Sequence, residues 1–245
     1  GKYEQVKAGM MQDLFTRGLT PDGKLRLPRH DAPDLYKETR IGWIPRDWEV
    51  KSFGSEIEVI DPNPSHRYPD EVVDAIPICS TENFRGENSF SVEKSKHVPI
   101  AVYHQQNNRC QFKSLDVVFA RKGKIGLARR YGQGLKVFSH TVVTMKPKND
   151  ETDPAWLLWL ARCSWFLNGI DRRMNTNSGV PTLGVDFIKN IEVPFPSSME
   201  QKEQNIRLDS MSASLELERE KLQKLNQQKS GLMHDLLTGE VPVKV

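Results

Sequence analysis

A cluster of cations in the middle of the chain could bind phosphate. Between Gln111 and Lys136 the sequence has seven Lys and Arg against one acid, although the whole chain of 245 residues carries a formal charge of only +3. Lysine and arginine neutralise phosphates, and arginine also pairs with guanine through two hydrogen bonds. A basic island on a nearly neutral protein predicts one localised anionic partner. The candidate residues are Arg121, Lys122, Lys124, Arg129 and Arg130.

A glycine interrupts this cluster where a phosphate would need close access to the backbone. Gly123 lies between Lys122 and Lys124, and glycine allows such an approach. The flanking residues are apolar and β-branched and predict strands, with Arg129 and Arg130 on the partner strand. The predicted strands cover 115–121, 125–131 and 137–145, and 132–134 is the predicted hairpin turn between the last two.

Two further polar stretches could read base edges. The first combines cations with amides and hydroxyls: Arg172, Arg173, Asn175, Asn177, Ser178 and Thr182. The second is the run 105–109, in which Gln or Asn could contact adenine. A solvated surface is the alternative in each case, and for 105–109 it is the preferred interpretation. No aromatic residues alternate with these cations as in single-strand binders, so duplex is favoured.

Motifs for catalysis and for metal or cofactor binding are missing from the sequence. It has no G-x-G-x-x-G and no P-loop, and its six His and three Cys show no metal-ligand spacing. The stretch 61–64 resembles an amino-methyltransferase motif, but Pro64 replaces the aromatic residue, so we interpret it as a surface turn. We therefore expect no catalytic residue, no metal and no bound cofactor. Three widely spaced cysteines fit free thiols in a reducing cytoplasm, and no apolar run is long enough to span a membrane.

The elements that position these residues form a mixed α/β (α+β) domain, β-rich in its middle. Asp153 and Pro154 predict the start of a helix that buries one apolar face and ends at Gly169. The predicted organisation is 1–19 as the end of a helix, 20–40 as a linker, 41–196 as the globular domain, 197–238 as a second, long helix and 239–245 as a tail.

The second helix, 197–238, is long and has an apolar seam. Ser197 is its predicted N-cap with Glu200 as capping-box partner, and no Gly or Pro follows until Gly231. About forty residues give roughly 60 Å of helix. We expect such a helix to project and to need a partner helix, as in a coiled coil; folding back on its own domain is the alternative. The seam residues are Leu208, Met211, Leu215, Leu222, Leu225, Leu232 and Leu236.

The end of this helix repeats the start of the chain. Residues 2–16 and 224–238 match without gaps at eight of fifteen positions, including Gly9 with Gly231 and Asp13 with Asp235. Chance similarity between two amphipathic helices would rarely give that many matches, so duplication is the better explanation. The opening segment would then be the C-terminal end of a preceding unit. This predicts that the chain is the second half of a duplicated protein.

In their order and spacing, four stretches resemble the specificity (S) subunit of type I restriction–modification systems. They are "IGWIPRDWEV" (41–50), "DVVFARKGKIG" (116–126), "SGVPTLGVDFIKNIEVPFPSSMEQKEQ" (178–204) and "LNQQKSGLMHDLLTGEVPV" (225–243). The resemblance implies two target-recognition domains, each reading half of a split duplex DNA site. It also implies two conserved helices that form an antiparallel coiled coil, here between the two halves or two copies of the chain. Our hypothesis is that the hairpin 121–130 and the loop 172–182 enter the major groove.

The same resemblance implies the partners. Methyltransferase (M) subunits would clamp around the scaffold and restriction or motor (R) subunits would join for cleavage, with S-adenosylmethionine, ATP and Mg bound by those subunits. Two other classes stay open: a coiled-coil adaptor whose head binds protein, and the recognition part of a methyltransferase fusion.

Overall fold

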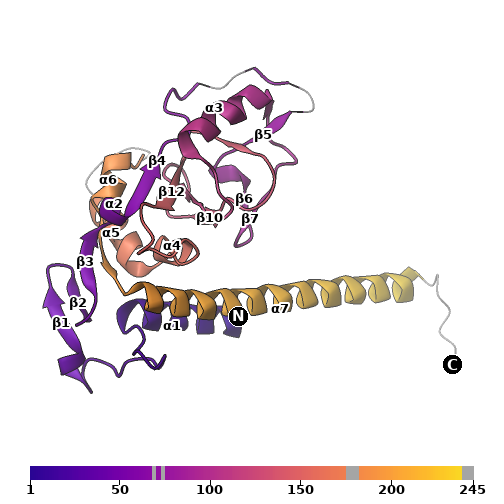
Figure 1. Cartoon of the computed structure of the whole chain (residues 1–245). Helices are drawn as coiled ribbons and strands as arrows, with labels where there is room; N and C mark the ends of the chain where they lie inside the picture. The colour runs from indigo at the N-terminus through magenta and orange to yellow at the C-terminus, as the bar shows by residue number, and fades with distance from the viewer. Residues whose placement is uncertain (68–69, 73–74, 175–181, 239–245) are drawn as a thin grey trace, which may run out of the picture. The chain divides into compact units, whose positions relative to one another are not determined.

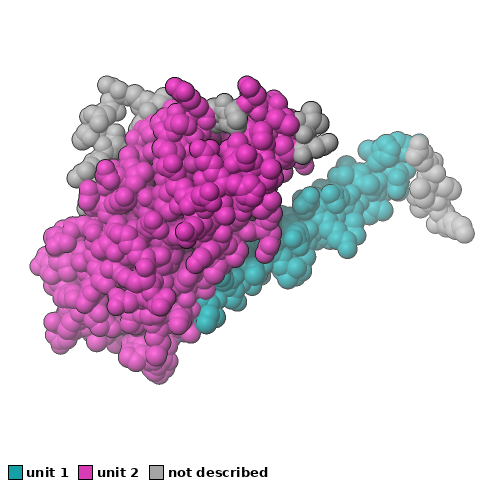
Figure 2. Space-filling model, turned by 45° about the horizontal axis from the view of Figure 1, so that its top comes forward, with its two compact units in different colours: residues 1–11, 206–245 teal, residues 12–205 magenta. Residues whose placement is uncertain are grey.

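The computed structural model describes residues 1–67, 70–72, 75–174 and 182–238. The chain divides into two compact units, Gly1–Met11 with Ile206–Val245 and Gln12–Asn205 (Figure 2). The second unit has mixed α/β structure, as the strand and helix patterns of the sequence predict. Its four-stranded central sheet has the order β10-β9-β12-β4, and every neighbouring pair is antiparallel. These strands are β4 (Ile57–Ile60), β9 (Val117–Ala120), β10 (Ala128–Arg130) and β12 (Val142–Pro147).

Smaller sheets and short helices surround this sheet. Figure 1 shows α2 and α6 together near β4, and α3 beside β5. The remaining strands are β1 (Tyr36–Thr39), β2 (Gly42–Pro45), β3 (Glu49–Ser52), β5 (Ile76–Cys79), β6 (Phe84–Arg85), β7 (Ser89–Phe90), β8 (His97–Val98), β11 (Val137–Phe138) and β13 (Glu192–Phe195). The helices are η1 (Pro33–Leu35), α2 (Phe53–Glu56), η2 (Thr81–Asn83), α3 (Ile100–Cys110), α4 (Leu157–Leu160), α5 (Ser164–Met174) and α6 (Val185–Lys189).

The predicted basic hairpin 121–130 forms, because β10 pairs with β9 across the turn 121–127. The second predicted hairpin, between strands 125–131 and 137–145 with its turn at 132–134, does not form. Strand β11 instead pairs in parallel with β5, and β12 pairs with the other side of β9. The turn closes because Gly123 and Gly126 have φ of 76° and 91°, a region that side chains disfavour. Lys122 and Lys124 lie in this turn, at the tip of the hairpin.

The predicted helix from Asp153 to Gly169 is in fact two helices. Asp153 does act as a cap, since its Oδ1 accepts hydrogen bonds from the backbone N–H groups of Ala155 and Trp156, both at 2.9 Å. Gly169, however, lies inside α5 and does not end it. A Cβ at this position would stand 2.6 Å from Cγ2 of Ile191. The glycine is therefore required for close packing of α5 rather than for a helix stop.

Residues 20–40, expected to be a linker, carry regular structure. Strand β1 pairs with β2, and Tyr36 is buried. Arg26 is also buried and forms ion pairs with Asp47 and Glu200. Tyr36 and Arg26 therefore attach this segment to the second unit.

The long helix α7 (Ser198–Thr238) has 41 residues and confirms the long helix predicted over 197–238. Only half of the predicted capping box forms. The Ser197 Oγ accepts from the backbone N–H of Glu200 at 3.3 Å. The Glu200 carboxylate does not return to Ser197; it accepts from Leu19 N at 2.6 Å and from the Trp48 indole at 3.0 Å. The first turn of α7 is thus bonded to the body of the second unit.

In the first unit, α1 (Lys2–Thr16) lies antiparallel beside α7, as expected for a coiled coil (Figure 1). Glu4 and Arg219 form an ion pair at 2.8 Å between the two helices. The early seam residues Leu208 and Leu215 are buried and Met211 is half-buried. The later ones are 59–63% exposed: Leu222, Leu225, Leu232 and Leu236. No described residue covers this second part of the seam.

Candidate nucleic-acid interface

The tip of the β9–β10 hairpin presents two lysines. Lys122 is half-buried and Lys124 is exposed. Lys122 forms a β-bridge with Thr182, and the N–H of Leu183 donates to the carbonyl of Arg121 at 2.9 Å. The structure therefore brings together the hairpin and the end of the second candidate loop. Thr182 is exposed beside the lysine turn.

Arg121 at the base of this turn is buried and has protein partners. Its Nη2 forms an ion pair with Asp61 at 2.5 Å, and its Nε donates to the carbonyl of His140 at 2.9 Å. These contacts fix the hairpin to the segment after β4. Because its guanidinium is already bonded inside the protein, we revise the predicted role of Arg121 from DNA contact to support of the turn.

The two arginines of β10 also point to protein atoms. Arg129 is buried, its Nη1 donates to the carbonyl of Ala128 at 2.8 Å, and its guanidinium lies 5.3 Å from the centre of the Phe84 ring. Burial lowers the pKa of Arg129. Arg130 is half-buried and donates to the carbonyl of Ala155 at 3.2 Å. The predicted DNA contact of Arg129 is revised in the same way, whereas that of Arg130 stays a prediction. At the tip of the hairpin, Lys122 and Lys124 are the candidates for phosphate binding.

Most of the second candidate loop lies outside the described residues. This holds for Asn175, Asn177 and Ser178, and for the tail 239–245. The backbone of Arg172 and Arg173 belongs to the last turn of α5. For all five of these residues, DNA contact remains a prediction.

The segment 61–67 is a surface turn next to the lysines, as predicted for 61–64. Its first residues form an Asx turn, because Asp61 Oδ1 accepts from the N–H of Asn63 at 2.9 Å. His66 has φ of 54° and stacks on His140, with ring centres 4.7 Å apart. Partial burial and the nearby His66 and Lys122 lower the pKa of His140. Sequence reasoning did not find this histidine pair, because the two residues are far apart in the chain.

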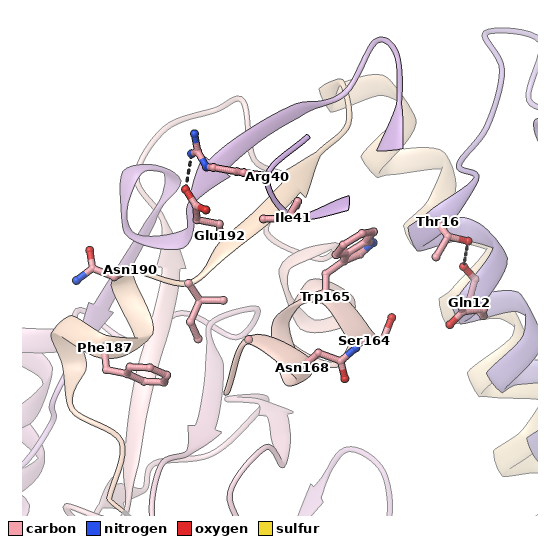
Figure 3. A pocket seen from close by; sticks show the side chains of 12 residues that line it. Gln12, Thr16, Arg40, Ile41, Ser164, Trp165, Asn168, Phe187, Asn190 and Glu192 are labelled. Carbon is pink, nitrogen blue, oxygen red and sulfur yellow. Dashed lines mark hydrogen bonds and ion pairs between the residues drawn. The ribbon is translucent and has the colours of Figure 1, made fainter. Parts of the chain in front are cut away.

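A cavity of about 450 Å³ is lined by residues from α1, the β1–β2 turn, α5 and β13. Figure 3 shows Arg40 meeting Glu192 on one side of it and Trp165 near its centre. The Trp165 indole donates to the carbonyl of Phe15 at 2.6 Å. The two charged residues of the cavity lining, Arg40 and Glu192, are thus paired with each other, and the lining has no histidine or cysteine. This part of the second unit offers no arrangement for acid–base or nucleophilic chemistry.

Among the described residues, no group of three or more His, Cys, Asp or Glu side chains could hold a metal ion. All three cysteines are buried free thiols. Burial raises the pKa of Cys79 and Cys110 to about 11 and that of Cys163 to about 12. Thiolate is therefore scarce at neutral pH, and these residues are inert core side chains. None of the described helices combines the length and the apolar composition that crossing a membrane requires.

Comparison with solved structures supports the same arrangement of elements. The type I restriction–modification S subunit of M. genitalium superimposes with a TM-score of 0.59 at 12% identity, covering 100% of this chain and 55% of that chain. The HsdS subunit of Thermoanaerobacter tengcongensis gives 0.53 at 12% identity, covering 98% and 52%. At this identity, the likeness establishes the fold.

Comparison of sequences identifies the family. The chain is 25% identical to the type I restriction enzyme MjaVIII specificity subunit of Methanocaldococcus jannaschii over 98% of its own length and 54% of the relative. It is 22% identical to the putative MjaX specificity subunit of the same organism, over 98% and 52%. The chain thus spans about half the length of these relatives. Residues 45–227 match the family model described as type I restriction modification DNA specificity domain, and the chain therefore belongs to that family.

Proposed function

We propose that this chain is a DNA sequence-recognition part of a type I restriction–modification complex and binds one half of a bipartite duplex site. The observation that carries the proposal is the family match over residues 45–227, which contain the exposed lysine turn. Lys122 and Lys124 stand at the tip of a rigid hairpin with Thr182 beside them. Such a turn can neutralise phosphates and fix the register of the domain on the duplex.

The long helix gives the proposed assembly its scaffold. Its exposed seam, Leu222 to Leu236, would pair with the equivalent helix of another half or of a second copy. M subunits would hold this scaffold and R subunits would join them in the cytoplasm. S-adenosylmethionine, ATP and Mg would be bound by those partners, so we propose no catalytic role for this chain itself.

The salt dependence of duplex binding tests the phosphate contacts. Each neutralised phosphate contributes a slope of about −0.9 to a plot of log K against log salt concentration. The double variant Lys122→Ala/Lys124→Ala is expected to bind all duplexes more weakly and to flatten that slope by about two units. Binding would be measured by fluorescence anisotropy of a labelled duplex across a salt series.

A double variant with the same loss of charge serves as the control. Lys224 and Lys229 are exposed on α7, so Lys224→Ala/Lys229→Ala should leave the slope unchanged. An unchanged slope in the hairpin variant would remove the lysine turn from the interface. Absence of salt-dependent duplex binding by the wild-type chain would instead favour an adaptor with a protein-binding head. Methyl transfer from labelled S-adenosylmethionine by the purified chain would favour a methyltransferase fusion.

A further inference from the structure

A groove of about 300 Å³ lies between α3 and the segment 62–67. Its floor is apolar and comes from Ile78 of β5 and from Val137 and Phe138 of β11. Val102, Gln105, Gln106 and Arg109 line the wall on α3; their spacing places them on one face of the helix. Asn63 and Arg67 stand on the opposite wall. Polar side chains thus surround an apolar floor on both sides.

Three of these polar side chains are available to a ligand. Gln105, Arg109 and Arg67 are exposed. Within the described part of the chain, the Gln105 amide and the two guanidinium groups form no hydrogen bond or ion pair. Gln105 and Arg109 are four residues apart on α3 and so point the same way. An amide and a guanidinium therefore stand next to each other at the rim, without protein partners.

The wall that carries them is rigid. The buried Gln106 amide donates to the carbonyl of Phe138 at 2.8 Å and accepts from the Phe138 N–H at 2.9 Å. The two hydrogen bonds tie α3 to the floor strand β11. At its C-terminal end, Lys146 Nζ donates to the carbonyl of Gln111 at 2.9 Å. Because the helix is fixed in this way, binding requires no ordering of its backbone.

The charged side chains that line the groove are all cationic. Its lining residues include two arginines and no Asp or Glu. Two other cavities differ. In the cavity described above, Arg40 forms an ion pair with Glu192. In a further cavity, lined by residues of η2 and the segment 91–96, Glu82 and Glu93 stand among the cations. Since the arginines are not neutralised by a carboxylate in the groove lining, the groove suits an anionic partner that also offers hydrogen-bonding groups.

This groove and the lysine turn share one segment. Asp61 precedes the wall 62–67 and holds Arg121 at the base of the hairpin. His66 in the same wall stacks on His140. The segment 61–67 therefore connects the hairpin that carries Lys122 and Lys124 to the rim of the groove.

We infer that Gln105 and Arg109 contact base edges of the duplex, whereas Lys122 and Lys124 contact its phosphates. Glutamine pairs with adenine and arginine with guanine, each through two hydrogen bonds in the major groove, which admits a helix. The inference rests on the proposed function and assigns specificity within it. It reverses the preference for a solvated surface at 105–109, because the structure shows a rigid and acid-free groove there.

Selection from a randomised duplex library tests the inference. The full chain and the variants Gln105→Ala and Arg109→Ala would each select from the same library, with sequencing of the bound fraction. A bidentate contact discriminates by about 1–3 kcal/mol, which corresponds to about 5- to 150-fold. Each variant is expected to lose that much preference at one base pair that the wild type selects. Gln105→Ala should keep the salt slope of the wild type, because no phosphate contact is removed.

Asn108→Ala is the matched control, because Asn108 is an exposed amide on the same helix that does not line the groove. It should select the wild-type sequence, and thermal unfolding should show that all three variants are folded. If Gln105→Ala and Arg109→Ala select the wild-type sequence, the inference is overturned while salt-dependent binding and the proposed function stand. A shift caused by Asn108→Ala at the same base pair would move base reading away from the groove and also overturn it. A wild-type chain that binds duplex without base preference overturns it too, and one that binds no duplex overturns both proposals.

Discussion

Five hydrogen bonds converge on the carboxylate of Glu200. They come from Leu19 N, two nitrogens of Arg26, the Trp48 indole and Gln204 Nε2. Burial alone would lower the pKa of Arg26, but the hydrogen bonds and charges of Glu200 and Asp47 outweigh it and raise the pKa. A buried charge pair is costly to break, because removal of one partner leaves the other charged and desolvated.

Glu200→Gln should therefore destabilise the chain. The substitution removes the charge that compensates Arg26 and replaces one acceptor oxygen by a donor. We expect a loss of about 3 kcal/mol in the free energy of unfolding, measured by urea denaturation. Asp22→Asn is the control, because the Lys24–Asp22 pair is exposed and such pairs contribute little. Equal stability of Glu200→Gln and the wild type would show that the buried pair does not hold α7 to the domain.

Residue types and turn positions predicted the lysine turn, but they did not reveal the protein partners of Arg121 and Arg129. Arg121 and Asp61 are 60 residues apart, and nothing in their local pattern indicates that they pair. The same holds for Gln106 and Phe138, whose pairing makes the α3 groove rigid. Composition can propose which side chains are able to bind DNA. Tertiary contacts decide which of them remain available.

At the scale of elements, the two copies of the repeat share their secondary structure but not their environment. Residues 2–16 form α1 and residues 224–238 form the end of α7. Both copies of the repeat are thus helical, as their sequence similarity predicted. Leu14 is 2% exposed, whereas its counterpart Leu236 is 62% exposed. The carbonyl of Leu14 also accepts from Gln204 at 3.1 Å. One copy is thus part of a core, and the other is a surface in the described chain.

This contrast gives a matched pair of substitutions. Leu14→Ala should lower the free energy of unfolding by about 2–5 kcal/mol, because it leaves a cavity in a packed site. Leu236→Ala should change it by less than about 0.5 kcal/mol, as expected for an exposed position. Thermal or urea unfolding of the two variants beside the wild type measures the difference. Similar losses from both would mean that the second copy is also packed against the protein in solution.

Local signals predicted most elements, and topology accounts for the failures. The long helix, the strand 192–195 and the Asp153 cap follow from periodicity and capping residues. The parallel pairing of β11 with β5 did not follow, because Gly132 and Gly134 also suit a hairpin turn between neighbouring strands. Gly169 was predicted to end a helix, but it lies inside α5. A side chain there would collide with Ile191, a contact that no local pattern reveals.

At the scale of the whole molecule, the exposed seam of α7 predicts association. Leu225, Leu232 and Leu236 are more than 60% exposed along one long helix. An apolar stripe of this kind in water favours a partner helix. Sedimentation velocity of the wild-type chain at increasing concentration should show self-association. The double variant Leu232→Glu/Leu236→Glu should stay monomeric, and its free energy of unfolding should equal that of the wild type. A wild-type chain that stays monomeric at high concentration would contradict the proposed pairing.

The ion pair between Asp61 and Arg121 has a consequence for engineering new specificities. It links the wall of the α3 groove to the base of the lysine turn, and the Lys122–Thr182 bridge extends the linkage to a third stretch of the chain. A chimera that imports helix 100–110 alone would meet a wall and a turn adapted to another sequence. Transplanting 61–67, 100–110, 121–130 and residue 182 together would keep their mutual support, so the exchangeable module is discontinuous in the chain.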